Sequence, residues 1–577
     1  MLRHGRSKRN RRKLPMLAII ALILFGIAAG GSLGILGGDY ISGLYAANLG
    51  VPASSDNLNP KTGTEDVLTS PEKAAATVPT VAAVTIPVSS LPASFKGFSS
   101  EVLVNRKATP GYKRAYGLEF PSSAEFSTLE GVTCFRGNNY RDSASYGSAD
   151  IKLGKLKKVW SVKNGYIDGW TGTGWNGQPA IVKWSPEVRN MMNIYPSKKM
   201  KEYLKEVIYA TLDGKIYFFD LDDGKPTRAA INVGSPHKGS VVIDPRGYPL
   251  LYAGQGIPEK AGKPIPIGYR IFSLINQKQL YFINGMDQDA FRHWGAFDSG
   301  AMIDAATDTF IECGENGVIY SGKLNTSFNA EKRSISIKPD LVKYRYKSPF
   351  GTKIGVENSP PIYKNYIYFA DNSGLFQCLD LNTMKPVWIR NVTDDTDSTT
   401  ALEETENGVF LYTACEVDHQ GKNGASFIRK LNALTGDMLW EQKVPCYYDA
   451  NTNGGALASP VIGKNDIKDL VIYNIAKTGR NDESILLAIN RETGKTKWSV
   501  KMKYYCWSSP VAVYSKEGKS YIVNCDSRGN MMLYEGTTGK LLDTISLGSN
   551  VEASPAAYDD MLVVGTRGRT IWGVRIE

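Results

Sequence analysis

A short motif recurs in the carboxy-terminal part of the chain, and it limits the fold more than any other feature. Its clearest copy spans residues 488–498, where an apolar run leads into a polar Thr-Gly-Lys turn that is followed by Trp. The pattern predicts a β-hairpin, because glycine supplies positive φ at the turn and Trp anchors the next strand. A hairpin cannot bury its own apolar face, so the copies must stack on one another. Related segments are residues 220–225, 380–388, 431–440 and 534–542.

A second marker, a Ser-Pro pair just before an apolar strand, counts the repeats. Proline suits the first residue of a strand or a sheet edge, and the innermost strand of a propeller blade has such an edge. We therefore predict an all-β fold, an eight-bladed β-propeller of four-stranded antiparallel blades, with seven blades as the alternative because the early spacing is loose. The blades are expected to start near residues 178, 235, 300, 359, 399, 459, 509 and 554, where Ser-Pro or a partial match occurs.

Each end of the repeat region lacks part of a blade. Residues 156–162 resemble an outer strand but have no inner strands before them, and the last repeat, 551–574, has no outer strand after it. We expect the early strand to complete the last blade and close the ring, because closure removes a free sheet edge. The propeller is predicted to span residues 129–577.

The amino-terminal part has a different composition. Residues 14–36 are almost continuously apolar, which is enough to cross a bilayer as a helix, and the preceding residues 1–13 hold seven Lys or Arg and no acid. This charge bias predicts a cytoplasmic amino terminus, a single membrane pass and an extracytoplasmic propeller, with a cleaved signal peptide as the alternative. Residues 37–128, rich in Pro, Ala, Ser and Thr, are predicted to be a tether and an extended arm.

Charge and cysteine spacing exclude several classes of protein. The formal net charge is +11, but seven of the cations lie in residues 1–13, so the rest is close to balanced and gives no reason to expect nucleic-acid binding. The seven cysteines stand singly without a CxxC motif, which excludes a zinc ribbon and a small-secreted-domain disulfide framework. We expect buried thiols and leave open a bridge between Cys446 and Cys506.

The repeat pattern resembles the pyrroloquinoline-quinone-like (PQQ-like) β-propeller repeats. Copies that end at Trp388, Trp440 and Trp498 match well, the copy at Gly539 lacks the Trp, and the copy at Gly224 is degenerate. A Phe-Arg-Gly-Asn segment at residues 135–138 also resembles a lead-in of secreted members. The resemblance covers about residues 130–577. It implies the fold, but the family includes quinone-dependent alcohol and glucose dehydrogenases, a non-catalytic lipoprotein that assists outer-membrane assembly, and anchored surface proteins without a known role.

The links between predicted blades cross one mouth of the channel, and they are rich in acids and aromatic residues. Such a concave patch suits a cation, a sugar or an extended peptide. The alternative is that the aromatic rings wedge the blades together and the acids cap turns. The predicted ligand-binding residues are Trp170, Trp175, His293, Trp294, Asp298, Glu357, Asp397, Tyr447, Asp449, Tyr505, Trp507 and Glu552.

We therefore expect a membrane-anchored propeller that acts as a non-catalytic binding or scaffolding module at the cell envelope. Its mouth would bind a protein segment or an envelope polymer, without a cofactor. Whether it is an enzyme stays open, because the resemblance implies a PQQ- and calcium-dependent dehydrogenase as an alternative, although the adjacent cysteine pair of the alcohol-oxidising members is absent. A structural surface protein without a specific ligand is the third hypothesis.

Overall fold

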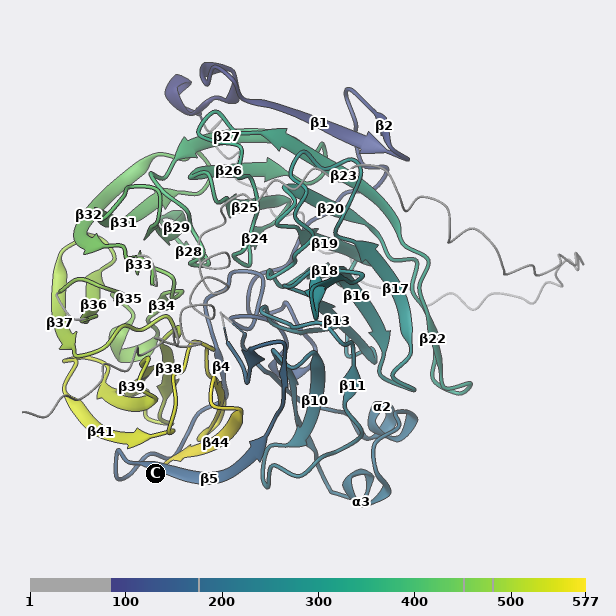
Figure 1. The fold of residues 1–577 in the computed structure, drawn as a ribbon, viewed down its shortest axis with the longest axis vertical. Helices are drawn as coiled ribbons and strands as arrows, with labels where there is room; N and C mark the ends of the chain where they lie inside the picture. The colour runs from purple at the N-terminus through teal and green to yellow at the C-terminus, as the bar shows by residue number, and fades with distance from the viewer. Residues whose placement is uncertain (1–84, 175–176, 450–451, 480–481) are drawn as a thin grey trace, which may run out of the picture. The chain divides into compact units, whose positions relative to one another are not determined.

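The structure is a computed structural model that describes residues 85–174, 177–449, 452–479 and 482–577 (Figure 1). The predicted basic tail, the membrane-spanning segment at residues 14–36 and most of the tether lie outside the described residues. No helix within the described ranges is long and apolar enough to cross a membrane.

Eight antiparallel sheets surround a central axis as the blades of a propeller (Figure 1), so the prediction of eight blades is confirmed and the alternative of seven is wrong. Each blade runs from an inner to an outer strand, and the predicted starts lie just before an inner strand except for the one at residue 235. That start was placed too early, because β12 begins at Val242 and Ser240 takes the position of the marker. The first four blades are β8 (Ala180–Lys183), β9 (Lys205–Ala210), β10 (Lys215–Asp220) and β11 (Ile231–Asn232); β12 (Val242–Ile243), β13 (Leu250–Gly254), β16 (Gly268–Ser273) and β17 (Gln279–Asn284); β18 (Met302–Asp304), β19 (Thr309–Cys313), β20 (Val318–Lys323) and β23 (Asp340–Lys347); and β24 (Ile362–Tyr363), β25 (Tyr366–Ala370), β26 (Leu375–Asp380) and β27 (Lys385–Asn391).

The last blade takes its outer strand from the amino-terminal side of the propeller. β5 (Leu156–Lys163) pairs antiparallel with β44 (Thr570–Ile576), which confirms the predicted closure of the ring. Blades five to eight are β28 (Ala401–Thr405), β29 (Gly408–Ala414), β31 (Asn423–Asn432) and β32 (Met438–Tyr447); β34 (Val461–Ile462), β35 (Leu470–Ile475), β36 (Ser484–Asn490) and β37 (Thr496–Met502); β38 (Val511–Tyr514), β39 (Ser520–Cys525), β40 (Asn530–Glu535) and β41 (Leu541–Ser546); and β42 (Ala556–Tyr558), β43 (Met561–Thr566), β44 (Thr570–Ile576) and β5 (Leu156–Lys163).

Shorter strands, hairpins and turns flank the blades. β1 (Ser99–Val104) pairs with β23 and gives the third blade an additional outer strand, followed by β2 (Lys107–Ala108). On the inner side, β3 (Glu130–Val132) pairs with β8, and β4 (Ser145–Tyr146) runs parallel to β42. The remaining elements are the hairpins β6 (Tyr166–Ile167) with β7 (Trp170–Thr171), β14 (Glu259–Lys260) with β15 (Lys263–Pro264) and β21 (Ser327–Asn329) with β22 (Ser334–Ser336), the pair β30 (Glu416–Val417) and β33 (Gly454–Gly455), the helices α2 (Pro186–Met191) and α3 (Pro196–Lys199), and the 3₁₀ turns Val88–Ser90, Pro92–Ser94 and Asn465–Ile467.

The Trp of each repeat motif connects neighbouring blades. Trp440 on the outer strand β32 donates its Nε1–H to the carbonyl oxygen of Arg491, 2.8 Å away in the next blade. The turn glycine of that next blade, Gly494, lies so close that an added Cβ would be 2.8 Å from the indole ring. Glycine is therefore needed both for its φ of +67° and for the close approach. The same contact joins Trp160 to Gly224, Trp388 to Gly436 and Trp498 to Gly539.

The Ser of the Ser-Pro marker forms a ring of hydrogen bonds around the channel. The backbone N–H of Thr399 donates to Ser459 Oγ at 3.0 Å, that of Ser459 to Ser509 Oγ at 3.0 Å, and that of Ser509 to Ser554 Oγ at 3.2 Å. Each bond ties the start of one blade to the start of the next. Equivalent bonds join Gln178 to Ser240, Gly300 to Ser359 and Ser359 to Thr399.

The segment at residues 133–144 closes the channel beneath this ring. Arg136 donates to the carbonyl oxygen of Pro510 at 3.0 Å, and Arg141 donates to that of Gly300 at 2.6 Å, on the opposite side of the channel. Both guanidinium groups are buried, and burial lowers the pKa of Arg136 to about 10. The predicted lead-in thus serves as a plug that bonds to blades on opposite sides of the channel.

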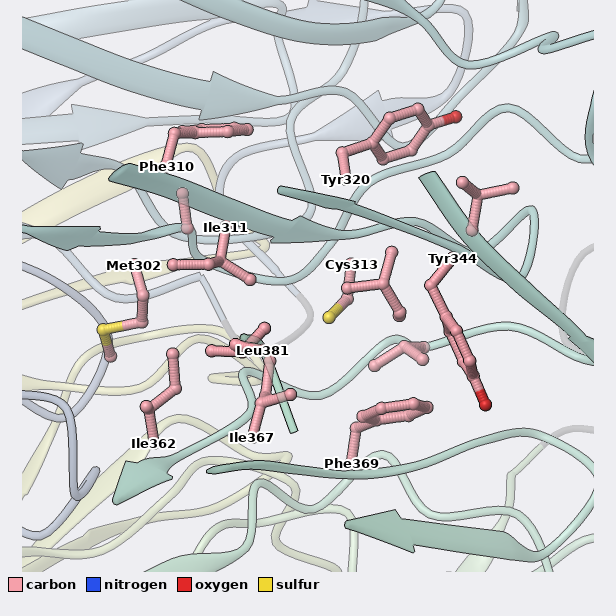
Figure 2. Close-up of a cluster of buried hydrophobic side chains, with 14 of the residues drawn as sticks. Met302, Phe310, Ile311, Cys313, Tyr320, Tyr344, Ile362, Ile367, Phe369 and Leu381 are labelled. Carbon is pink, nitrogen blue, oxygen red and sulfur yellow. The ribbon is translucent and has the colours of Figure 1, made fainter. Parts of the chain in front are cut away.

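Apolar clusters fill the spaces between blades. Figure 2 shows the cluster between the third and fourth blades, where Ile311 and Cys313 face Ile367 and Phe369. All seven cysteines are buried and free. The prediction of buried thiols is therefore confirmed, and a bridge between Cys446 and Cys506 is wrong.

Candidate functional site

The first acidic cluster lies where the second, third and fourth blades meet at the mouth. Asp298 and Glu357, from two links between blades, lie beside Glu315 of the turn between β19 and β20, with one oxygen of each within 4.8 Å of the others. The Nζ of Lys238 is 2.6 Å from Asp298 and 4.0 Å from Glu315. Burial opposes the charge on Lys238, but Asp298, Glu315 and Glu357 together raise its pKa. An internal ammonium group therefore neutralises part of this cluster.

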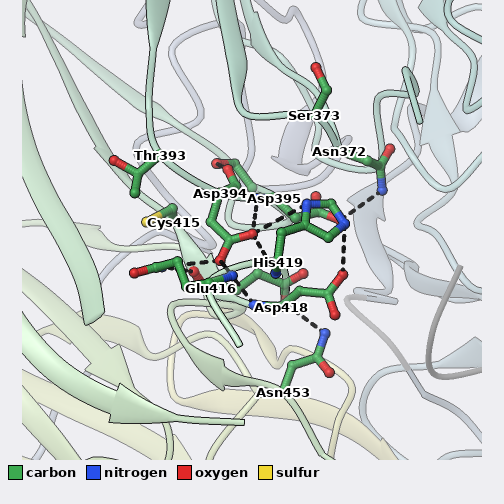
Figure 3. A network of polar contacts seen from close by, with 12 residues as sticks. Asn372, Ser373, Thr393, Asp394, Asp395, Cys415, Glu416, Asp418, His419 and Asn453 are labelled. Atoms are coloured by element: carbon green, nitrogen blue, oxygen red, sulfur yellow. Dashed lines mark hydrogen bonds and ion pairs between the residues drawn. The ribbon is translucent and has the colours of Figure 1, made fainter. Parts of the chain in front are cut away.

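A second acidic cluster follows around the mouth. Asp395 and Asp397, in the link from β27 to β28, lie beside Glu416, with one oxygen of each again within 4.8 Å of the others. Figure 3 shows Asp395 and Glu416 with their polar neighbours. Asn372 donates to Glu357 at 2.7 Å and to Asp395 at 3.0 Å. The two clusters are therefore connected through one amide group, and six carboxylates form a continuous arc.

Aromatic side chains lie at the mouth beyond the second acidic cluster. The Tyr505 and Trp507 rings lie 5.1 Å apart at 51°, and the Trp507 indole donates to the carbonyl oxygen of Asn453 at 3.2 Å. The Asn453 amide in turn donates to Glu416 at 3.3 Å, which links the aromatic pair to the second acidic cluster.

Trp170 and Glu552 also belong to this part of the mouth. Arg567 bonds to Glu552 at 3.2 Å and lies 5.9 Å from the centre of the Trp170 ring. Asn550 donates to Glu552 at 2.8 Å and to the Tyr505 hydroxyl at 3.4 Å. Glu552 is therefore paired with a cation, unlike the acids of the second cluster.

The remaining predicted residues occupy the rim. Trp294 is 36% exposed and donates its Nε1–H to Glu315 at 2.6 Å, and the adjacent His293 is exposed. Asp449 pairs with Lys477, whose backbone carbonyl accepts from the N–H of Tyr447.

Trp175 lies outside the described residues. The contacts therefore bring Trp170, Tyr505, Trp507 and Glu552 into one network and Trp294, Asp298, Glu357 and Asp397 into the acidic arc. Tyr447 and Asp449 form a separate group around Lys477.

Sequence reasoning missed Glu315, Asp395 and Glu416. Glu315 stands in the turn after β19, which ends at Cys313, and Glu416 stands at the start of β30, just beyond β29, which ends at Ala414. These turns reach the same mouth as the links between blades. An acid shortly after the second strand was therefore a usable signal in the third and fifth blades, although not every blade has one there.

Comparison with known proteins agrees with this fold. The family model described as "Outer membrane protein assembly factor BamB" matches residues 481–577, a stretch that includes the Thr-Gly-Lys turn and the closing blade. The match covers only the carboxy-terminal part of the chain, and it supports the PQQ-like repeats that the sequence predicts there. No curated protein sequence matches this chain.

The chain also matches solved structures, and two of them are compared with it here. Quinohemoprotein alcohol dehydrogenase ADHIIG from Pseudomonas putida HK5 has 11% identity and a TM-score of 0.52, covering 78% of this chain and 80% of that chain. BamB from Moraxella catarrhalis has 15% identity and a TM-score of 0.45, covering 73% of this chain and 99% of that chain. At 11% identity, the similarity to the dehydrogenase shows a shared fold alone and does not transfer an activity.

Proposed function

We propose that this PQQ-like propeller is a non-catalytic binding or scaffolding module of the cell envelope, and that its mouth binds a protein segment or an envelope polymer. The observation that carries the proposal is the acidic arc, which lies beside exposed aromatic surface above a closed channel. Six carboxylates with one ammonium group favour a ligand that carries positive charge. The exposed Trp294 ring beside Glu315 offers an apolar contact next to that charge.

We also propose that residues 14–36 anchor the chain in the membrane, with residues 1–13 in the cytoplasm and the propeller outside it. The support is compositional: an apolar segment long enough for a bilayer follows a cluster of seven cations. The Pro- and Ala-rich segment after it would hold the mouth at a distance from the lipid surface. The description of the matching family, an outer membrane assembly factor, is consistent with a protein partner.

Photo-crosslinking in intact cells tests this function. A photoreactive amino acid at His293, which is exposed at the mouth, is compared with one at Asn407, which is exposed in the turn between β28 and β29 at the opposite end of the blades. The proposal predicts a discrete adduct from His293 that is lost when Trp294→Ala is added, and no such adduct from Asn407. Adducts of equal yield from both positions, or none from His293, would support the structural-protein hypothesis instead.

The second candidate function is a PQQ- and calcium-dependent dehydrogenase. The observation that favours it is the donor set at the mouth, because buried carboxylates are the ligands that calcium takes. Bound quinone would supply the electron acceptor, and the acids of the arc would hold the metal and accept a substrate proton. Titration with quinone and a dye-reduction assay separate this function from simple binding.

A further inference from the structure

The plug segment carries a buried guanidinium group that forms no ion pair with any acid of the described ranges. Arg136 is 1% exposed, and burial lowers its pKa to about 10, which leaves it charged at neutral pH. Its two terminal nitrogens donate to the carbonyl oxygens of Pro510 and Pro460. These carbonyl groups accept hydrogen bonds but carry no net charge. The guanidinium group is therefore hydrogen-bonded without being neutralised.

The third nitrogen of this guanidinium group has no partner. Nε of Arg136 is buried without a hydrogen-bond acceptor. A buried donor of this kind is costly, because it has lost its water and gained nothing in return. Since the donor belongs to a charged group, an anion is the acceptor that would bind it most strongly.

Arg136 lines a small cavity between the plug and the inner strands of the sixth and seventh blades. The cavity has a volume of about 10 Å³, which is room for one particle of about the size of a water molecule. It lies near the ends of β34 and β38 that point away from the mouth. Its polar lining residues are Arg136, Asp142, Ser143, Ser145, Lys464 and Tyr514.

Two of these residues add donors to the orphaned N–H. Lys464 supplies an ammonium group. The Tyr514 hydroxyl oxygen accepts the backbone N–H of Lys464 at 2.9 Å, so its own proton is available for a second hydrogen bond. Burial raises the pKa of this hydroxyl, which therefore stays a donor at neutral pH. The cavity is thus surrounded by more donors than it has acceptors to match.

Asp142 balances only part of the positive charge around the cavity. Its carboxylate lies 3.3 Å from the Nζ of Lys464 and accepts from Asn138 at 2.8 Å. It is the acid among the lining residues, and it faces two cations, Arg136 and Lys464. Two positive charges and one negative charge leave one positive charge, which a single monovalent anion would neutralise.

We propose that this cavity binds one chloride ion, held by Arg136, Lys464 and Tyr514. A water molecule would accept the Nε–H but would leave the positive charge unbalanced. Phosphate and carboxylate ions contain several heavy atoms, and a cavity of about 10 Å³ does not enclose them. Chloride is a single atom that accepts hydrogen bonds from several donors at once, so it matches both the size and the charge of the cavity.

The ion would join the plug to three blades. Lys464 follows β34 of the sixth blade, Tyr514 ends β38 of the seventh, and Ser145 lies in β4, which pairs with β42 of the eighth. Chloride is therefore expected to stabilise the folded propeller and to fix the plug against these blades. The inference does not depend on which ligand the mouth binds, because the cavity lies at the other end of the inner strands.

The test measures anion-dependent stability of the purified full-length chain in detergent micelles. Thermal unfolding is followed by tryptophan fluorescence in sodium gluconate, and chloride, bromide or phosphate replaces gluconate at constant ionic strength, so that charge screening stays the same. Wild type should show a saturable rise in Tm with chloride and with bromide, because both bind the folded chain. A crystal grown in bromide should show an anomalous peak beside Nε of Arg136.

Two variants and a control assign the effect to the cavity. Lys464→Gln removes one cation and should weaken chloride binding at least tenfold, read from the concentration at which the rise in Tm is half complete. Tyr514→Phe removes one donor and is the second variant, in case the first does not fold. Lys468→Gln is the matched control, because Lys468 is an exposed lysine in the same connection between β34 and β35 but does not line the cavity. It should keep the wild-type response to chloride.

Three results would contradict the proposal. Equal Tm values in chloride and gluconate, or a bromide crystal without a peak at Arg136, would overturn it and leave water as the occupant of the cavity. An unchanged chloride response in both Lys464→Gln and Tyr514→Phe would overturn the assignment of the ion to these residues. A saturable response to phosphate without one to chloride would overturn the choice of a monatomic anion.

Discussion

Replacing Gly494 by alanine tests how the blades are joined. The φ of Gly494 is +67°, a conformation that costs an L-residue about 1–2 kcal/mol. The new Cβ would also lie 2.8 Å from the Trp440 ring, and overpacking of this kind typically costs about 1–3 kcal/mol. Alanine also restricts the conformations of the unfolded chain, which stabilises the folded protein by about 0.4–1 kcal/mol. The expected net loss in the free energy of unfolding is therefore about 1–5 kcal/mol.

Gly262 provides the control for the backbone contribution. Its φ is +68°, and an added Cβ would meet nothing within 4 Å. Gly262→Ala should therefore carry the cost of the φ angle without the clash. The difference between the two variants should be about 1–3 kcal/mol, measured by equilibrium urea unfolding followed by tryptophan fluorescence.

A double mutant isolates the contact itself. In a Trp440→Ala background, Gly494→Ala should cost no more than Gly262→Ala, because the ring that it would strike is gone. Equal losses for Gly494→Ala and Gly262→Ala in the wild-type background would refute the reasoning. The Trp-Gly contact would then be incidental to the joining of blades.

Two further predictions concern the channel and a buried histidine. Ser459→Ala leaves the buried N–H of Thr399 without its acceptor and should lower the free energy of unfolding, measured in urea, by about 1–3 kcal/mol. Ser334→Ala, at an exposed serine, is the control and should cost little. Equal losses for the two variants would contradict the role of the hydroxyl ring. Burial lowers the pKa of His237 to about 4. Between pH about 6.5 and 4, this imidazole is therefore protonated in the unfolded chain but neutral in the folded protein. The free energy of unfolding should therefore fall as the pH is lowered from about 6.5 to 4, and His237→Asn should remove part of this pH dependence. An unchanged pH dependence in the variant would exclude His237 as the cause.

The blade count was predictable because its markers are local. A Ser-Pro pair or its partial match precedes every inner strand, and the Trp strand at residues 156–162 could be assigned to the last blade since that blade lacked a partner. The role of the Trp itself was only partly predictable. It anchors its strand, but its indole packs on the turn glycine of the next blade, and such a contact has no signal within one repeat.

The site was harder to predict because its contacts cross blades. Link residues such as Asp298 and Glu357 could be placed at the mouth from topology alone. Their partners could not, since Lys238 and Asn372 reach them from other segments of the chain. The plug was missed for the same reason: Arg136 bonds to carbonyl groups more than 300 residues away in the sequence.

The most direct test of the proposed function is calorimetric titration of the full-length chain with pyrroloquinoline quinone, with and without calcium, followed by dye reduction with alcohols and aldoses. A non-catalytic binding module predicts no saturable heat from the quinone and no turnover, with or without calcium. Saturable, calcium-dependent quinone binding with dye reduction would contradict it, and the carboxylates of the acidic arc would then be the first residues to substitute.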